Sequence, residues 1–250
     1  MRSKKRNNSK FIIAAVFIFC ITVVLYLVIV NLSPRRANSR LDSNSGDILA
    51  PSLLAVSDIS QSAKNGEYTV DGKIQYSKLF GKNVVIGDSI TEGLKAYGFL
   101  DDNQVVCEIG GSVMKGKDAV AKAARLEPLN VFFSYGTNDM GMYSGDTEAF
   151  IEDYSSIIVE FISLYPDANI YVNSIAKPSE EKIASGGKFY KWKDFNNEIK
   201  AMCDSFGLHY IDNTYILEEN PKLYAGDGIH VLPDYYPIWI MNMIKKIGNC

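Results

Sequence analysis

Cysteine and histidine are scarce in this sequence, and their scarcity excludes several kinds of site. The 250 residues include four cysteines and two histidines. No C-x-x-C pair and no H-E-x-x-H occurs, so the sequence contains no zinc ribbon, redox pair or zincin motif. We therefore expect neither a metal nor a cofactor. Four cysteines are also too few for a disulfide-stapled fold, although a bridge between Cys107 and Cys203 stays open.

Basic residues are not concentrated in the body of the chain. The formal net charge is −3, and no basic stripe runs downstream of the first forty residues. Nucleic acid is therefore not expected as a partner. The chain also lacks an internal repeat, which argues against a solenoid or an array.

One long apolar run stands out. Residues 11–30 contain no charge and no proline, and twenty helical residues span roughly 30 Å, the thickness of a bilayer core. This length favours an uncleaved transmembrane helix over a signal peptide, whose apolar region is about 7–15 residues, but cleavage stays open. Five basic residues precede the run and three follow it, which favours a cytoplasmic N-terminus and an extracytoplasmic domain at the cell membrane.

The rest of the chain divides by composition. Residues 1–10 form a basic tail, and residues 31–67, rich in Ser, Asn, Asp and Ala, are predicted to be a flexible linker. Residues 68–250 are enough for one domain with a full core.

Strand and helix patterns alternate through that domain. Five short apolar runs, at 83–87, 104–110, 130–136, 168–176 and 208–214, are typical of strands. Between or after them, apolar residues at helical spacing predict helices that begin near Asp146, near Phe189 and near Pro233. This alternation predicts an α/β fold, a three-layer α/β/α sandwich around a parallel sheet, preceded by the transmembrane helix.

Ser89 follows the first of these strands directly, in "VVIGDSI". Ligands of parallel sheets bind at the carboxyl ends of the strands, so a serine there is a candidate nucleophile. A serine hydroxyl needs a neutral histidine to take its proton and a carboxylate to hold the histidine's tautomer. "AGDGIHVLP" supplies both, since Asp227 and His230 are three residues apart and can project to one side. His209, inside a predicted strand, is expected to be packed.

Acyl transfer also needs hydrogen-bond donors for the oxyanion. Ser89 can offer its own amide if it opens a helix. Gly110 or Gly111 in "EIGGSV" can offer a second amide, and Asn138 in "SYGTND" can offer a side-chain amide. Each stretch alone is a typical turn, but together they end successive elements of one sheet.

In these four motifs, taken in order, the chain resembles the SGNH hydrolases, also called the GDSL esterase and lipase family, over residues 80 to 247. The resemblance implies a flavodoxin-like sheet and the catalytic residues Ser89, Asp227 and His230. It also implies an oxyanion hole formed by Ser89, Gly110 and Asn138, with Gly111 remaining possible. "GDSI" stands where the family usually has Gly-Asp-Ser-Leu, a change that leaves the chemistry unaltered.

The resemblance implies a serine esterase, and the expected position outside the membrane suggests a small ester or an acylated envelope carbohydrate as its substrate, with acetyl as the first acyl group to consider. A lysophospholipase, an acyltransferase and a tethered binding module without activity are the alternatives. The first two would use the same residues, whereas fold alone never implies activity.

Overall fold

The computed structural model describes residues 68–70 and 73–248. The chain divides into two units, Met1–Asp47 and Ile48–Cys250, and every described residue belongs to the second. The predicted membrane span at 11–30, the basic tail and the predicted linker at 31–67 all lie outside the described residues. Within the residues that are described, no helix has the length and apolarity needed to cross a membrane.

From β3 to β7, each strand of the described domain is followed by one or more helices before the next strand. The strands are β1 Thr69–Val70, β2 Lys73–Ile74, β3 Asn83–Gly87, β4 Val105–Cys107, β5 Asn130–Ser134, β6 Asn169–Asn173 and β7 His209–Ile211. The α-helices are α3 Tyr76–Phe80, α4 Ser89–Ala96, α5 Lys117–Ala124, α6 Asp139–Met142, α7 Thr147–Leu164, α8 Glu180–Ala184, α9 Trp192–Phe206, α10 Thr214–Glu219 and α11 Tyr235–Ile247. Short 3-10 helices are η2 Asp102–Gln104, η3 Val113–Lys115, η4 Phe189–Lys191 and η5 Pro221–Leu223.

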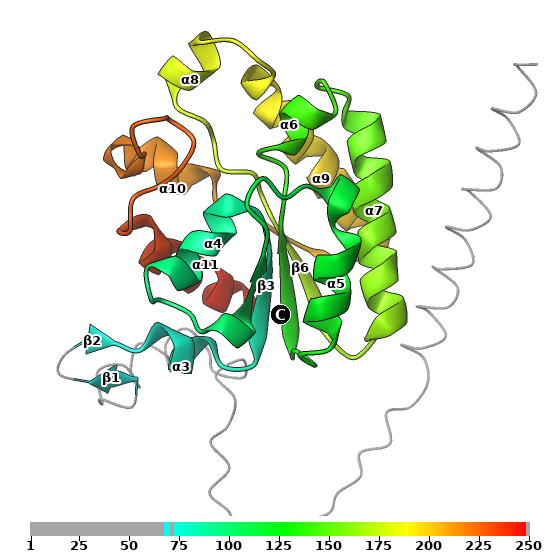
Figure 1. Ribbon diagram of the computed structural model, residues 1–250, viewed down its shortest axis with the longest axis vertical. Coiled ribbons are helices and arrows are strands. Elements are labelled where there is room, and N and C mark those ends of the chain that lie inside the picture. Colours follow the sequence, from blue (N-terminus) through cyan, green and yellow to red (C-terminus); the bar gives the residue numbers. More distant parts are fainter. Residues whose placement is uncertain (1–67, 71–72, 249–250) are drawn as a thin grey trace, which may run out of the picture. The chain divides into compact units, whose positions relative to one another are not determined.

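Five strands form one parallel sheet in the order β4-β3-β5-β6-β7, while β1 and β2 pair separately as an antiparallel ribbon. This is the flavodoxin-like order, in which the chain reverses direction across the sheet between β3 and β5. All five predicted strand runs contain a strand of this sheet. The carboxyl ends of the strands point to the top of Figure 1, where α6 and α8 lie.

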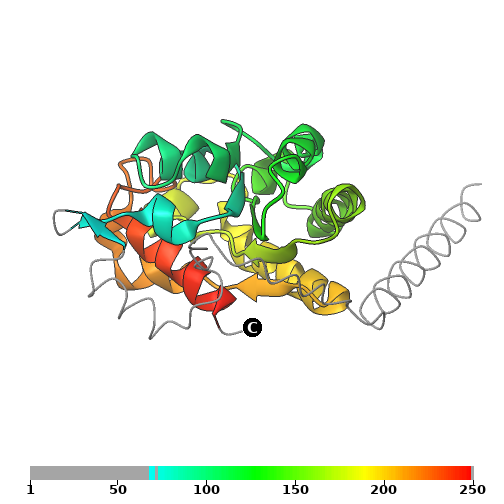
Figure 2. The same ribbon diagram turned by 90° about the horizontal axis from the view of Figure 1, so that it is seen from below.

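Helices cover both faces of the sheet, and the strand side chains alternate between the two layers. On β3, Val84 and Ile86 pack into one core with α5, α7 and α9, whereas Val85 packs into the other with α3, α4 and α11. Figure 2 shows these helices on either side of the sheet. Because both faces are buried, the central residues of β3, β5 and β6 are all apolar or aromatic. The three-layer α/β/α architecture is confirmed for the described residues.

The three predicted helices are present as α7, α9 and α11. Asp146 caps α7 by accepting hydrogen bonds from the amides of Glu148 and Ala149, and the predicted stripe on this helix is buried from Phe150 to Phe161. The α9 stripe begins in η4 rather than in α9 itself. Propensity patterns locate helix boundaries only to within a few residues.

The disulfide that the sequence left open between Cys107 and Cys203 is not formed, because both thiols are free. The two residues belong to opposite layers. Cys203 lies in the core that includes α7 and α9, whereas Cys107 packs against the core that includes α4 and α11. The sheet separates them, so a bridge would require the fold to open.

Candidate active site

The turn after β3 places Ser89 at the first position of α4. Asp88 is the N-cap of this helix, and its Oδ1 accepts a hydrogen bond from the Ile90 amide at 3.0 Å. This cap does not use the Ser89 amide, one of the donors that a helix start leaves without an intrahelical partner. Gly87 is required sterically, since a Cβ there would lie 2.5 Å from the Ser134 carbonyl oxygen. The close approach of β3 to β5 therefore accounts for Gly87, and the start of α4 accounts for Asp88.

His230 reaches Ser89 from the loop before α11, and Asp227 supports it. Ser89 Oγ lies 2.9 Å from His230 Nε2, and His230 Nδ1 lies 2.5 Å from Asp227 Oδ2. The other carboxylate oxygen of Asp227 accepts hydrogen bonds from the backbone amides of Ile229 and His230, at 3.0 and 2.9 Å. The structure thus joins all three residues that the sequence suggested in one continuous hydrogen-bonded chain, although Ser89 and His230 are 141 residues apart in sequence.

The charge on Asp227 determines the tautomer of the imidazole. Partial burial raises the pKa of Asp227, but the His230 ring, the two backbone amides and the charge of His230 outweigh it and lower the pKa to about 2. The carboxylate is therefore ionised at neutral pH and can only accept hydrogen bonds. Nδ1 of His230 must then carry the proton, which leaves Nε2 free to accept the proton of Ser89 Oγ.

The two loops beside Ser89 hold the predicted oxyanion donors. The Gly111 amide donates to the Glu108 carbonyl oxygen at 2.9 Å, so that amide is already used. Gly110 is exposed, has a φ of +69°, and has no hydrogen bond from its amide among the described residues. Asn138 Nδ2 donates to the Gly111 carbonyl oxygen at 3.0 Å, which fixes this side chain beside the glycine loop. The geometry favours Gly110 over Gly111 as an available amide.

Two carboxyl groups beneath this site escaped the sequence analysis. Burial raises the pKa of Asp88 to about 6, although the amides of Ile90 and Thr91 and the charge of His230 oppose the shift. Burial likewise raises the pKa of Asp139 to about 7, with a further contribution from the charge of Asp88. Asp88 had a recognisable signal, since Asp directly before a helix start is a typical N-cap. Asp139 had no recognisable sequence signal apart from its position directly after Asn138.

Ser179, which the sequence did not indicate as a site residue, holds the loop that carries Asp227 and His230. Its side chain caps α8 by accepting from the Lys182 amide at 3.1 Å, and its own amide donates to the Gly228 carbonyl oxygen at 2.8 Å. Gly228 has a φ of +69°, and a Cβ there would lie 2.4 Å from Ser179 Oγ. The segment before α8 is thereby fastened to the loop that carries Asp227 and His230.

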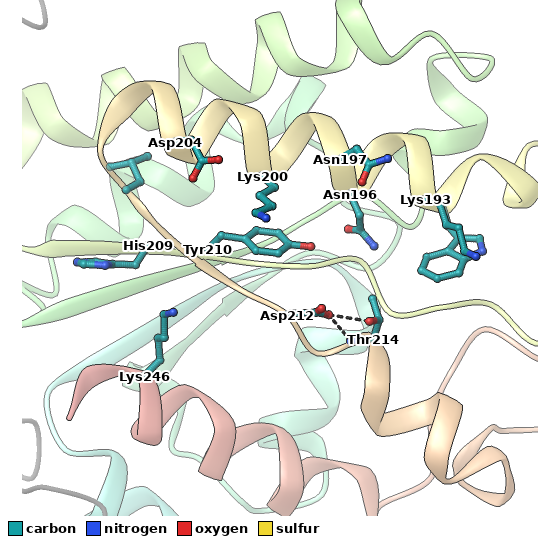
Figure 3. Close-up of a pocket in the computed structure, with 12 residues that line it drawn as sticks. Lys193, Asn196, Asn197, Lys200, Asp204, His209, Tyr210, Asp212, Thr214 and Lys246 are labelled. Carbon is teal, nitrogen blue, oxygen red and sulfur yellow. Dashed lines mark hydrogen bonds between the residues drawn. The ribbon is translucent and has the colours of Figure 1, made fainter. Parts of the chain in front are cut away.

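His209 takes no part in this site, as the sequence predicted. Its ring stacks on Tyr171 with centroids 4.8 Å apart, and burial lowers its pKa. It lies instead in a groove of about 720 Å³ that runs along the edge strand β7 between α9 and α11 (Figure 3). A second groove, of about 730 Å³, reaches Asp227 and Gly228 but not Ser89. Size alone therefore does not locate the candidate site.

No group of three or more potential metal-ligating His, Cys, Asp or Glu side chains occurs within residues 68–70 and 73–248. The described site consists of a hydroxyl, an imidazole, carboxylates and amides. These groups are those of acyl transfer by a serine nucleophile.

Comparison with known proteins gives the fold. No family model and no curated protein matches the sequence. Among solved structures, the chain is similar to a lipase/acylhydrolase from Enterococcus faecalis, at 16% identity and a TM-score of 0.50, over 67% of this chain and 96% of the other. A GDSL-like lipase from Bacteroides thetaiotaomicron matches at 16% and 0.50, over 78% and 98%. An acetylxylan esterase from Geobacillus stearothermophilus, Axe2, matches at 17% and 0.51, over 66% and 93%. The described domain thus has the fold of the GDSL-type lipases and acetylxylan esterases.

Proposed function

We propose that the protein is a serine esterase that hydrolyses a small acyl ester, with acetyl as the first candidate. The observation that carries this proposal is the hydrogen-bonded chain from Ser89 Oγ through His230 to Asp227, at 2.9 and 2.5 Å. It lies at the carboxyl edge of a parallel sheet, where such folds bind their ligands. The similar structures, which are named as lipases and an acetylxylan esterase, agree with an ester substrate.

In the first step, Ser89 Oγ attacks the ester carbonyl carbon while His230 Nε2 takes the hydroxyl proton. The carbonyl oxygen becomes an oxyanion, for which the Ser89 amide, the Gly110 amide and Asn138 Nδ2 are the proposed donors. Protonated His230 is stabilised by the ionised Asp227. It then gives the proton to the leaving alcohol oxygen, and an acyl-Ser89 ester remains.

In the second step, water attacks the acyl-Ser89 carbonyl. His230 takes one proton from that water and returns it to Ser89 Oγ as the acid leaves. The chain's own residues supply every proton transfer of this scheme. The helix start at Ser89 adds a favourable field for the negative charge, since the N-terminus of α4 carries partial positive charge.

A small cavity supports a small acyl group. It measures about 20 Å³ and is bounded by residues that flank Ser89 and Asn138 in sequence, including Asp88, Ile90 and Thr137. A space of this size holds about one water-sized group. Ser89 and Asn138 do not themselves line this cavity, so we propose it as the acyl site from its size and its neighbouring residues, and an acetyl methyl is the group that its size admits.

A lysophospholipid is the second candidate substrate, because apolar side chains stand exposed beside the reacting groups. Ile109, which precedes Gly110, is 75% exposed, and Leu232, two residues after His230, is 43% exposed. Exposed apolar groups at a site favour an apolar ligand.

For the esterase proposed first, we propose an acylated carbohydrate of the cell envelope as the molecule that carries the ester. The domain would reach it outside the cell membrane, with residues 11–30 as the anchor. This placement rests on the sequence alone.

The test is hydrolysis of nitrophenyl esters from acetyl to palmitoyl by the full chain, with Ser89→Ala as the control. The proposal expects a Ser89-dependent rate that falls steeply beyond acetyl. A rate that holds or rises with chain length would favour the lipid substrate. A rate equal in the parent protein and in Ser89→Ala would refute a serine esterase.

A further inference from the structure

Two hydrogen bonds join the loops that carry the proposed oxyanion donors. Asn138 Nδ2 donates to the Gly111 carbonyl oxygen, and the Val113 amide donates to Asp139 Oδ1, both at 3.0 Å. The first bond uses the donor residue itself. The second uses its neighbour in sequence, which opens α6. Asp139 thus connects the loop after β4 to the loop after β5, next in sequence to the proposed donor Asn138.

The Asp139 carboxyl that accepts the bond from the Val113 amide is buried in an environment that is unfavourable for a carboxyl group. The side chain is fully buried, and its Oδ2 has no hydrogen-bond partner among the described residues. Ser112 Oγ, next to Val113, is likewise buried without a partner there. Burial of a carboxyl group with an unpaired oxygen is costly, so the Val113 contact is retained in the fold against an opposing free energy.

The charged and titratable groups around Asp139 do not offer it another role. Burial is the main cause that raises the pKa of Asp139 and of Tyr135, Tyr143 and Tyr154. The charge of Asp88 adds to the shift of Asp139, and the charge of Asp139 adds to the shifts of the three tyrosines. None of these groups is a cation that would pair with a carboxylate. The bond that Asp139 Oδ1 accepts from the Val113 amide reaches across to the loop after β4, whereas the Gly136 amide and its own amide act on the carboxyl from its own side.

We propose that Asp139 is a positioning residue of the oxyanion hole, fixing the loop of Gly110 relative to Asn138. The inference rests on the proposed function. Oxyanion donors act only when they stand about 2.7–3.1 Å from the position that the oxyanion will occupy. A misplacement of about 1 Å can lower the rate on the order of a hundredfold. Loss of the Asp139–Val113 bond leaves only the Asn138–Gly111 bond of these two links between the loops, so the Gly110 loop can shift relative to Asn138.

The test compares Asp139→Ala with Asp139→Asn, which keeps an oxygen able to accept from the Val113 amide. We expect kcat on nitrophenyl acetate to fall by roughly 10- to 100-fold in the alanine variant, with KM changed less than about threefold. The asparagine variant should stay within about threefold of the parent, because the bond is restored. An asparagine variant as slow as the alanine variant would overturn the positioning role.

The matched control is Asn130→Ala at the opposite end of the sheet. Asn130 is also buried and bonds to Asn83 and Asn169 at the amino ends of three strands. Its loss should lower the unfolding temperature, because the bonds to Asn83 and Asn169 are removed, yet leave kcat within about threefold. Equal kcat losses in the two variants would show that Asp139 is merely structural and would overturn the proposal.

If Asp139→Ala does not fold, Val113→Pro removes the same bond from the donor side. Val113 is the first residue of η3, where proline is tolerated, and Ser112 before it is extended, as a residue before proline prefers. We expect the same selective loss of kcat. The unaltered protein and Ser89→Ala are assayed in parallel: no Ser89-dependent rate would refute the esterase and this role together. A Ser89-dependent rate that Asp139→Ala and Val113→Pro leave unchanged would refute this role alone.

Discussion

Replacement of Asp227 by asparagine tests whether the carboxylate sets the tautomer of His230. The asparagine side chain would keep an oxygen to accept from the backbone amides of Ile229 and His230, so the loop should keep its shape. Its amide nitrogen, however, would donate to His230 Nδ1 in place of the carboxylate oxygen 2.5 Å away. The imidazole proton then moves to Nε2, which can no longer accept from Ser89 Oγ. We expect kcat to fall about ten-thousand-fold, equivalent to roughly 5.5 kcal/mol of transition-state stabilisation.

The side chains of Asp227 and His230 are each about half exposed, at 47% and 48%, so solvent screens part of their interaction and a loss nearer a thousandfold is the lower bound. The assay is steady-state hydrolysis of nitrophenyl acetate, with thermal unfolding of the same samples. Asp227→Ala serves as the comparison, because it also removes the two backbone bonds and should destabilise the loop by roughly 1–3 kcal/mol. An asparagine variant within tenfold of the parent rate would refute the assigned tautomer.

Three more predictions concern folding and the site's architecture. Gly87→Ala should destabilise the protein and lower its yield, since its Cβ would meet the Ser134 carbonyl oxygen at 2.5 Å; an unchanged unfolding temperature would contradict this packing. Gly111→Ala should also reduce stability, because its Cβ would lie 2.8 Å from the Glu108 carbonyl oxygen; a stable, fully active variant would contradict it. Burial raises the pKa of Asp139 from 3.8 to about 7, so between pH 3.8 and about 7 this carboxyl is protonated in the folded state and ionised in the unfolded state. The free energy of unfolding of the protein should therefore decrease as the pH rises through this range, by up to about 4 kcal/mol. Urea unfolding across that range should show a smaller decrease for Asp139→Asn, and an equal decrease would refute the shift.

The sequence predicted the sheet well because its strands are buried on both faces. Runs such as residues 83–87 and 130–134 have three consecutive apolar residues at their centre and are bounded by turn residues, a pattern typical of short buried strands. The strand order required more, since a parallel sheet of five strands can be arranged in several ways. Only the family resemblance supplied that order.

The reacting residues of the candidate site were predictable from the sequence, whereas the residues that support them were not. Ser89, His230 and Asp227 each belong to a residue type with a direct chemical role, and their positions after strands or in a loop indicated one edge of the sheet. The supporting residues were not predictable. Asp139 accepts a hydrogen bond from the backbone amide of Val113, and the Ser179 amide donates one to the backbone carbonyl oxygen of Gly228. Such contacts leave no periodicity or spacing in the sequence.

The most direct measurement is covalent labelling of the full chain with a fluorophosphonate, followed by mass analysis of its peptides. The phosphorus is attacked by an activated serine in the same way as an ester carbonyl. The proposed mechanism predicts one label per chain, on Ser89, with labelling lost in Ser89→Ala and greatly slowed in His230→Ala. Labelling that persists in Ser89→Ala, or a parent protein that takes up no label, would contradict a Ser89 nucleophile activated by His230.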